Sequence, residues 1–192
     1  MSEAGTQQIA NQGEPAAAGR TFAQRLLGAF RLDKSVYQEV ANDPGALAHA
    51  AGVVACVAVA HAIGASSSTT PMQAGLDAVS AFGFWLLTAV LVWSVGKVLR
   101  LPGDFGRVLR AVGFAMSPLI LVALILVANQ WIRAGILLLT YALLFGAFVV
   151  AVRPALRIAT GRAAFVCILV ALIIFFLYSV ALYAALQMGG TS

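Results

Sequence analysis

Charged residues are scarce in this chain of 192 residues, of which only 10% are Asp, Glu, Lys or Arg. A soluble globular domain usually carries about 25% charged and about 45–50% apolar residues. Here the apolar share is 61% and the mean hydropathy is +0.95. This composition excludes an ordinary soluble domain and predicts an all-α integral membrane bundle, because each apolar run of about 20 residues forms one crossing.

Cysteine is scarce as well. The two cysteines, Cys56 and Cys167, lie inside apolar stretches without a CxxC spacing, so they indicate neither a disulfide framework nor a zinc site. HExxH and GxSxG signatures and a phosphate-binding glycine loop are absent from the sequence. We therefore expect no catalytic, cofactor-binding or metal-binding residues, and no cofactor.

Ionisable side chains are missing from the centres of the apolar runs, where an enzyme or an ion-coupled carrier usually places them. His49 and His61 are twelve residues apart, which is roughly 18 Å along a helix, so they cannot share a metal. Asp77 lies near the outer start of the second run, where it either pairs with Arg133 or, as we favour, faces water. A lipid-modifying enzyme would need Asp77 or His61 as a catalytic group, and we expect a protein that is not an enzyme.

The first 43 residues divide into two parts. Residues 1–20 are rich in Ala, Gly and Gln and predict a disordered N-terminal tail without a cleavable signal peptide. Residues 21–43 predict a cytoplasmic amphipathic arm. Its first helix, with Phe22, Leu26 and Phe30 every four residues and arginines between them, either lies on an anionic lipid surface or is a short solvated helix. Ser35 and Gln38 have capping-box spacing ahead of a second short helix.

Five crossings are expected within a transmembrane domain of residues 44–187, followed by a short extracytoplasmic tail of residues 188–192. Their predicted ranges are 44–65, 71–98, 114–128, 135–152 and 163–187. Asp43 and Pro44 are interpreted as the N-cap and first residue of the first helix, and Thr70, Pro71 and Gln73 repeat the pattern at the second.

A short amphipathic segment precedes the third crossing. Asp104 is a candidate cap, Phe105 and Val108 belong to an apolar face, and Arg107 and Arg110 lie on the opposite face. This pattern predicts an interfacial helix in the plane of the headgroups. Pro118 either begins the third crossing, with Ser117 as its cap, or kinks it.

Basic residues are distributed unequally between the two sides of the five-crossing arrangement. Eleven Lys and Arg residues fall on the side of the N-terminus and only Arg133 on the other. Because basic residues concentrate in cytoplasmic loops, the N-terminus is expected in the cytoplasm and the C-terminus outside. Four of these residues, Arg107, Arg110, Arg153 and Arg157, are expected to face anionic lipid headgroups. A basic band of this kind disfavours nucleic acid as a partner.

Small residues recur every four positions along the first crossing, at Ala48, Gly52, Cys56, Ala60 and Gly64. Such a stripe lets two helix backbones approach closely. It predicts either packing within the chain or a homodimer, in which case Gly52→Leu would lower the yield of crosslinked dimer.

Several segments resemble the bacterial branch of the Yip family of multi-pass membrane proteins. The resemblance is carried by residues 36–44, by Phe105 with 109–115 and Ser117-Pro118, and by 151–153 with Ala155, Leu156 and 160–163. It covers about residues 30 to 185 and implies a cytoplasmic N-terminus, five crossings and, for a bacterial member, the cytoplasmic (inner) membrane. Eukaryotic members interact with Rab GTPases, but their Asp-Leu-Tyr-Gly-Pro motif is absent here, so that partner is not carried over.

Two functions are consistent with these observations. The first is a non-enzymatic scaffold, interaction partner or accessory subunit of a membrane complex, as a homo-oligomer or with other membrane-protein subunits. The alternative is a transporter or channel for a small neutral or apolar solute, with Thr88, Ser94, Thr140 and Tyr141 as its polar contacts. Broken helices in a repeated arrangement would favour the alternative.

Overall fold

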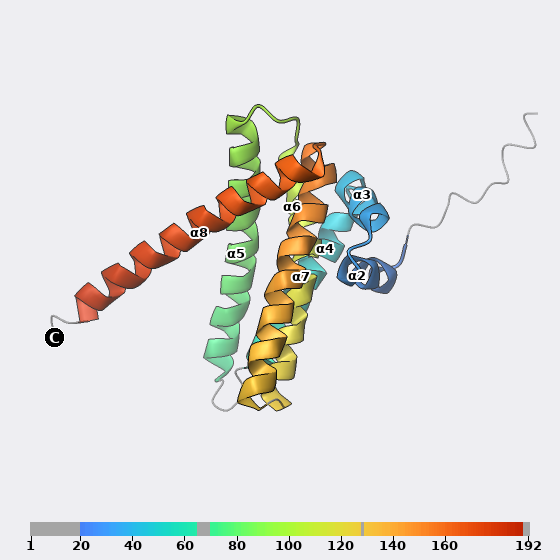
Figure 1. Ribbon diagram of the computed structural model, residues 1–192. Helices are drawn as coiled ribbons and strands as arrows, with labels where there is room; N and C mark the ends of the chain where they lie inside the picture. The colour runs from blue at the N-terminus through green and yellow to red at the C-terminus, as the bar shows by residue number, and fades with distance from the viewer. Residues whose placement is uncertain (1–19, 65–69, 128, 190–192) are drawn as a thin grey trace, which may run out of the picture.

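The computed structural model describes residues 20–64, 70–127 and 129–189, and these residues form helices without a strand (Figure 1). The predicted tail of residues 1–20 lies outside the described residues apart from Arg20, and most of the predicted tail at 188–192 lies outside them as well. In chain order the helices are α2 (Phe22–Phe30), α3 (Lys34–Asn42), α4 (Ala46–Gly64), α5 (Pro71–Val98), α6 (Phe105–Ala115), the 3-10 helix η1 (Ser117–Val127), α7 (Gln130–Leu156) and α8 (Thr160–Gly189).

Five stretches of the described residues are helical, long enough and apolar enough to cross a bilayer, and the all-α prediction is confirmed. They are Ala46–Ile63, Met72–Val98, Phe105–Ile125, Gln130–Leu156 and Thr160–Ala184. A helix crosses the hydrocarbon core with about 20 residues, so each stretch is sufficient for one crossing. The chain is an integral membrane protein.

The third span differs most from its predicted form. The segment expected in the headgroup plane is α6, which packs against α3, α4, α5 and α7 and buries Val108, Val112 and Phe114. It continues almost directly into η1, so the span begins at Phe105 instead of residue 114. Pro118 stands at the junction and, lacking an amide proton, cannot continue the α-helical ladder. The amide of Leu119 instead donates to the carbonyl of Met116, which is the 3-10 pattern.

Three helix starts test the capping predictions. Thr70 and Gln73 form the predicted capping box of α5. At α3, however, the N-cap is Asp33, whose carboxylate accepts from the amide of Ser35, and the proposed Ser35–Gln38 box is wrong. Asp43 is the C-cap of α3, and its Oδ1 also accepts from the amide of Gly45 just before α4, which begins at Ala46 and not at Pro44.

The fourth and fifth spans are longer than predicted. Asn129 accepts a hydrogen bond from the amide of Ile132 and so begins α7 within the segment expected to be a link. At the other end, Pro154 lies inside the last turns of α7, and the helix ends with Arg157 in the left-handed region at φ 53°. The helix α8 begins at Thr160, three residues before the predicted start.

Close packing joins α4, α5 and α6 in the centre of the bundle. A Cβ added to Gly113 would lie 2.8 Å from Cβ of Ala50 and 3.1 Å from Nε1 of Trp85, so only glycine fits there. The same indole nitrogen donates to the carbonyl of Leu109 over 2.9 Å. In contrast, α8 contacts the bundle near its beginning and then runs away from it (Figure 1).

Candidate functional site

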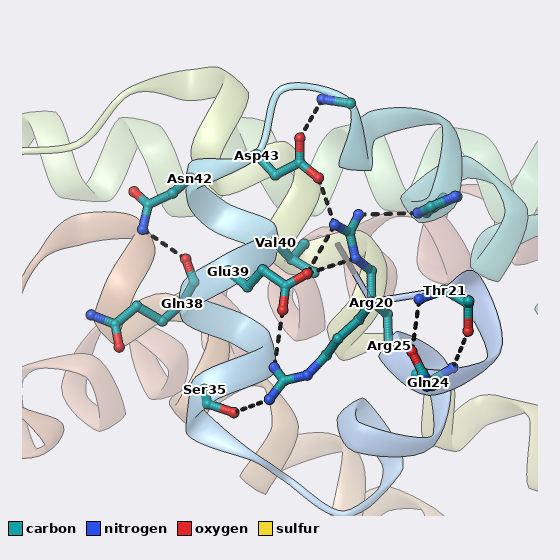
Figure 2. A network of polar contacts seen from close by, with 12 residues as sticks. Arg20, Thr21, Gln24, Arg25, Ser35, Gln38, Glu39, Val40, Asn42 and Asp43 are labelled. Atoms are coloured by element: carbon teal, nitrogen blue, oxygen red, sulfur yellow. Dashed lines mark hydrogen bonds and ion pairs between the residues drawn. The ribbon is translucent and has the colours of Figure 1, made fainter. Parts of the chain in front are cut away.

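The N-terminal arm is held against one end of the bundle by the buried guanidinium of Arg25, which is only 4% exposed. Arg25 Nε donates to Oε1 of Glu39 over 3.0 Å, and Nη2 donates to Oδ2 of Asp43 over 2.6 Å. Nη1 donates to Nδ1 of His49 over 3.1 Å. One side chain of α2 therefore joins the middle of α3, the end of α3 and the first turns of α4 (Figure 2).

A second arginine extends this network toward the surface. Arg20 Nη1 donates to Oε2 of Glu39 over 3.0 Å, and its Nη2 donates to the hydroxyl of Ser35 (Figure 2). Glu39 thus binds both arginines, one with each carboxylate oxygen. The hydrogen bond from Arg25 is the main reason that the pKa of Asp43 lies below its usual range.

The apolar face of α2 packs on protein. The ring of Phe22 lies 5.6 Å from that of His49, and its edge would be 3.3 Å from a Cβ added to Gly52. Ala29 is fully buried, and its carbonyl accepts a hydrogen bond from the buried hydroxyl of Tyr37. Burial raises the pKa of Tyr37. The apolar face of α2 is therefore covered by other parts of the protein. Neither alternative predicted for this helix, a lipid surface or solvent, included such packing.

Arg107 and Arg110, predicted to face lipid headgroups, both reach α3. Arg110 donates to the backbone carbonyls of Val40 and Ala41 over 3.3 and 2.8 Å. Arg107 donates to the side-chain oxygen of Asn42. These acceptors lie in the last turn of α3, where carbonyls have no partner within the helix. The two arginines therefore fix the arm to α6.

Arg153 and Arg157 lie elsewhere, on a small cavity between α3 and the end of α7. The cavity has a volume of about 260 Å³ and includes Lys34, Gln38 and Ile158 in its lining. The side chains of Lys34, Arg153 and Arg157 make no hydrogen bond or ion pair with another described residue. Of the four arginines, Arg107 and Arg110 therefore bind α3, whereas Arg153 and Arg157 line this cavity.

Comparison with family models decides which family the chain belongs to. The Yip1 domain model matches residues 33–182, which is most of the chain. The chain belongs to the Yip1 domain family. Neither the curated proteins nor the solved structures include a match to it. The match begins at the N-cap of α3 and ends within α8, so it covers α3, the first four spans and all but the last two residues of the fifth, while α2 and Arg25 precede it.

The small-residue stripe of this Yip1 domain does not lie on one uniform face of α4. Ala60 is buried, Gly52 and Cys56 are half-buried, and Ala48 is exposed. Gly64 is the last residue of α4. The residues that pack α4 into the core are instead Ala46, Ala50, Val53, Val54 and Val57. Gly52 faces Phe22 of the arm, so at least this position serves packing within the chain.

His61 and Asp77 line one cavity at the end of the bundle away from the arm. It has a volume of about 320 Å³ and also includes Ser80 and Tyr141. Nδ1 of His61 lies 3.1 Å from the carbonyl of Val57, one turn earlier in α4. Within the described residues no group of three His, Cys, Asp or Glu side chains could hold a metal ion.

A larger apolar cavity of about 550 Å³ lies between α5, α7 and α8 of the Yip1 domain. Thr88 and Tyr141 are part of its lining, but Ser94 and Thr140 are not. The hydroxyl of Thr88 donates to the carbonyl of Phe84 within α5. Only two of the four residues predicted to contact a solute therefore share this cavity.

Proposed function

We propose that this protein is a non-enzymatic scaffold or accessory subunit of a membrane complex, and that it belongs to the bacterial-type branch of the family. Its location would be the bacterial cytoplasmic membrane. The scarcity of ionisable residues within the apolar runs supports a role without catalysis, since membrane enzymes and ion-coupled carriers usually place such groups there.

The proposed orientation has the arm in the cytoplasm and the C-terminus outside. Four basic residues precede the first span, four more lie between Lys97 and Arg110, and three between Arg153 and Arg162. Helix α3 of the arm lies beside the end of the bundle where α7 ends and α8 begins (Figure 1). The three basic groups are thus gathered at one end, which is the distribution expected of a cytoplasmic face.

The observation that carries the proposal is the unpaired length of α8. Its buried residues are Ala163, Val166, Cys167 and Val170, all in its first turns. Beyond Ile174 every described side chain up to Gln187 is exposed, including Phe176 and Tyr183. An apolar helix that leaves its own bundle offers a long surface to a helix of another membrane protein, where association depends on packing.

A photocrosslinking experiment tests this role in the native membrane. Benzoylphenylalanine at Phe176 of α8 is expected to give protein adducts that mass spectrometry identifies. The matched control is the same group at Val90, which is an exposed apolar position of α5. Adducts at Phe176 that are absent at Val90 would support partner binding through α8.

Protein adducts at neither position, together with a monomer in gentle detergent, would contradict the scaffold role. Flux of a neutral solute into proteoliposomes would then favour transport, and in that case Thr88→Val and Tyr141→Phe should change the flux because both residues line the apolar cavity.

A further inference from the structure

The cavity between α3 and the end of α7 combines positive charge with an apolar wall. Lys34 and Gln38 lie one turn apart on α3, and Arg153 and Arg157 lie one turn apart at the end of α7. Residues four apart share a helix face, so α3 presents Lys34 and Gln38 together, and Arg153 of α7 and its C-cap Arg157 both line the cavity. Val150, Pro154 and Ile158 complete the lining.

Three positive charges are thus gathered without an acidic side chain in the lining. Arg107 is close enough to Arg157 for their charges to repel. The acids of the arm are engaged elsewhere. Glu39 and Asp43 bind Arg20 and Arg25, and the carboxylate of Asp33 accepts from the amide of Ser35 at the start of α3. An anion bound here would relieve the repulsion, and arginine pairs readily with phosphate through two parallel hydrogen bonds.

The position of the cavity along α7 points to a particular source of phosphate. The fourth span ends at Leu156 and the fifth begins at Thr160, so the cavity lies where the hydrocarbon of the bilayer meets its headgroups. Apolar residues beside the cations suit a ligand that is charged at one end and apolar at the other. Basic pockets between transmembrane helices bind lipid headgroups in this way.

We propose that Lys34, Gln38, Arg153 and Arg157 form a binding site for the phosphate of an anionic phospholipid headgroup. The site goes beyond the scaffold role and does not depend on it. Bound lipid would connect the arm, through Lys34 and Gln38, to the turn between α7 and α8.

Lipid binding to the full chain in detergent tests the site, with native mass spectrometry as the readout. The probes are dioctanoyl phosphatidylglycerol, dioctanoyl phosphatidylcholine and inorganic phosphate. The triple variant Lys34→Gln/Arg153→Gln/Arg157→Gln should weaken phosphatidylglycerol binding at least about tenfold, because each basic residue near a headgroup contributes on the order of 1 kcal/mol.

The matched control removes the same charge outside the cavity, as Arg31→Gln/Lys97→Gln/Arg100→Gln. It should change binding by less than about twofold, because none of these three residues lines the cavity. Equal losses in both triples would overturn the proposal in favour of diffuse surface charge. Equal binding of phosphatidylcholine would overturn it as well, and so would full competition by inorganic phosphate at the lipid's own concentration.

Should the triple variant fail to fold, Arg157→Gln alone provides the test, because this side chain is exposed. A loss of about threefold or more in this single variant, with unchanged helix content, would support the site. Unchanged phosphatidylglycerol binding would overturn it.

Discussion

Nη2 of Arg25 donates to Oδ2 of Asp43 over 2.6 Å and joins α2 to the residue that ends α3. The guanidinium is almost completely buried, whereas the side chains of Glu39 and Asp43 are 28% and 36% exposed. Burial therefore removes water mainly from the guanidinium of Arg25, whose charge must be compensated by its protein acceptors. The two carboxylates keep part of their hydration. Within the arm, Arg25 joins α2 to both α3 and α4.

Arg25→Met is expected to release α2 from α3 and α4. Removing one partner of a fully buried ion pair costs about 3–5 kcal/mol, and partial exposure of the carboxylates should reduce this to about 1–3 kcal/mol. Hydrogen exchange of the amides in α2 measures the release. Arg20→Gln is the control, because Arg20 is 39% exposed and should cost at most about 1 kcal/mol. Equal exchange rates in both variants would show that Arg25 contributes no more than Arg20 to holding α2 in place.

The attachment should also weaken in acid. Because Arg25 lowers the pKa of folded Asp43, its carboxylate stabilises the fold fully above the ordinary Asp value of about 3.9. This contribution is lost as the pH falls below that value and through the lower folded pKa. The midpoint of thermal unfolding in detergent should therefore drop as the pH falls below about 4. Asp43→Asn should show a smaller drop, and an identical profile would exclude Asp43 as a source.

The spans could be predicted from sequence because mean hydropathy is a local property. A run such as Gln130–Leu156 is apolar whatever surrounds it, and its length follows from the bilayer. The ends were less predictable. The predicted fourth crossing stops at residue 152, yet α7 continues through Pro154, because a late turn tolerates the missing hydrogen bond.

The site could not be predicted because its contacts join distant segments. An amphipathic pattern such as that of α6 is the same whether its apolar face meets lipid or protein. The sequence therefore does not reveal that Val108 and Phe114 are buried against other helices. Arg107 and Arg110 were assigned to headgroups since their acceptors on α3 lie about 65 to 70 residues away. For Arg25, the acids at 33, 39 and 43 are a usable signal, because all three lie within 20 residues of it and could accept its hydrogen bonds.

Gly52→Leu separates the two interpretations of the small-residue stripe. A side chain at this position must displace Phe22, whose ring edge is only 3.3 Å from an added Cβ. We expect the arm to loosen and trypsin to cut at Arg31 and Lys34 at least about threefold faster. Ala48→Leu is the control, because Ala48 belongs to the same stripe but is exposed.

Dimer crosslinking distinguishes the outcomes further. Loss of dimer in Ala48→Leu with a protease-resistant arm would assign the stripe to a homodimer. Unchanged dimer in both variants, with cleavage increased only in Gly52→Leu, would assign Gly52 to packing within the chain.

Gly113→Ala tests whether the bundle centre depends on close approach of α4, α5 and α6. The new Cβ would lie 2.8 Å from Cβ of Ala50, which cannot rotate away, so a helix must shift. Such overpacking costs about 1–3 kcal/mol. The shift should also lengthen the hydrogen bond from Trp85 to the carbonyl of Leu109. Reversible unfolding in mixed micelles measures the cost, and the Trp85 fluorescence reports the local change.

Gly83→Ala is the matched substitution, because Gly83 also lies within a spanning helix but nothing would be within 4 Å of its new Cβ. Alanine favours a helix over glycine by about 1 kcal/mol, so this variant should be as stable as the original chain or more stable. The same propensity gain acts at Gly113, and the difference between the two variants therefore isolates the steric effect. Equal stabilities would mean that α4 and α5 can move apart at no cost, and that Gly113 does not set their spacing.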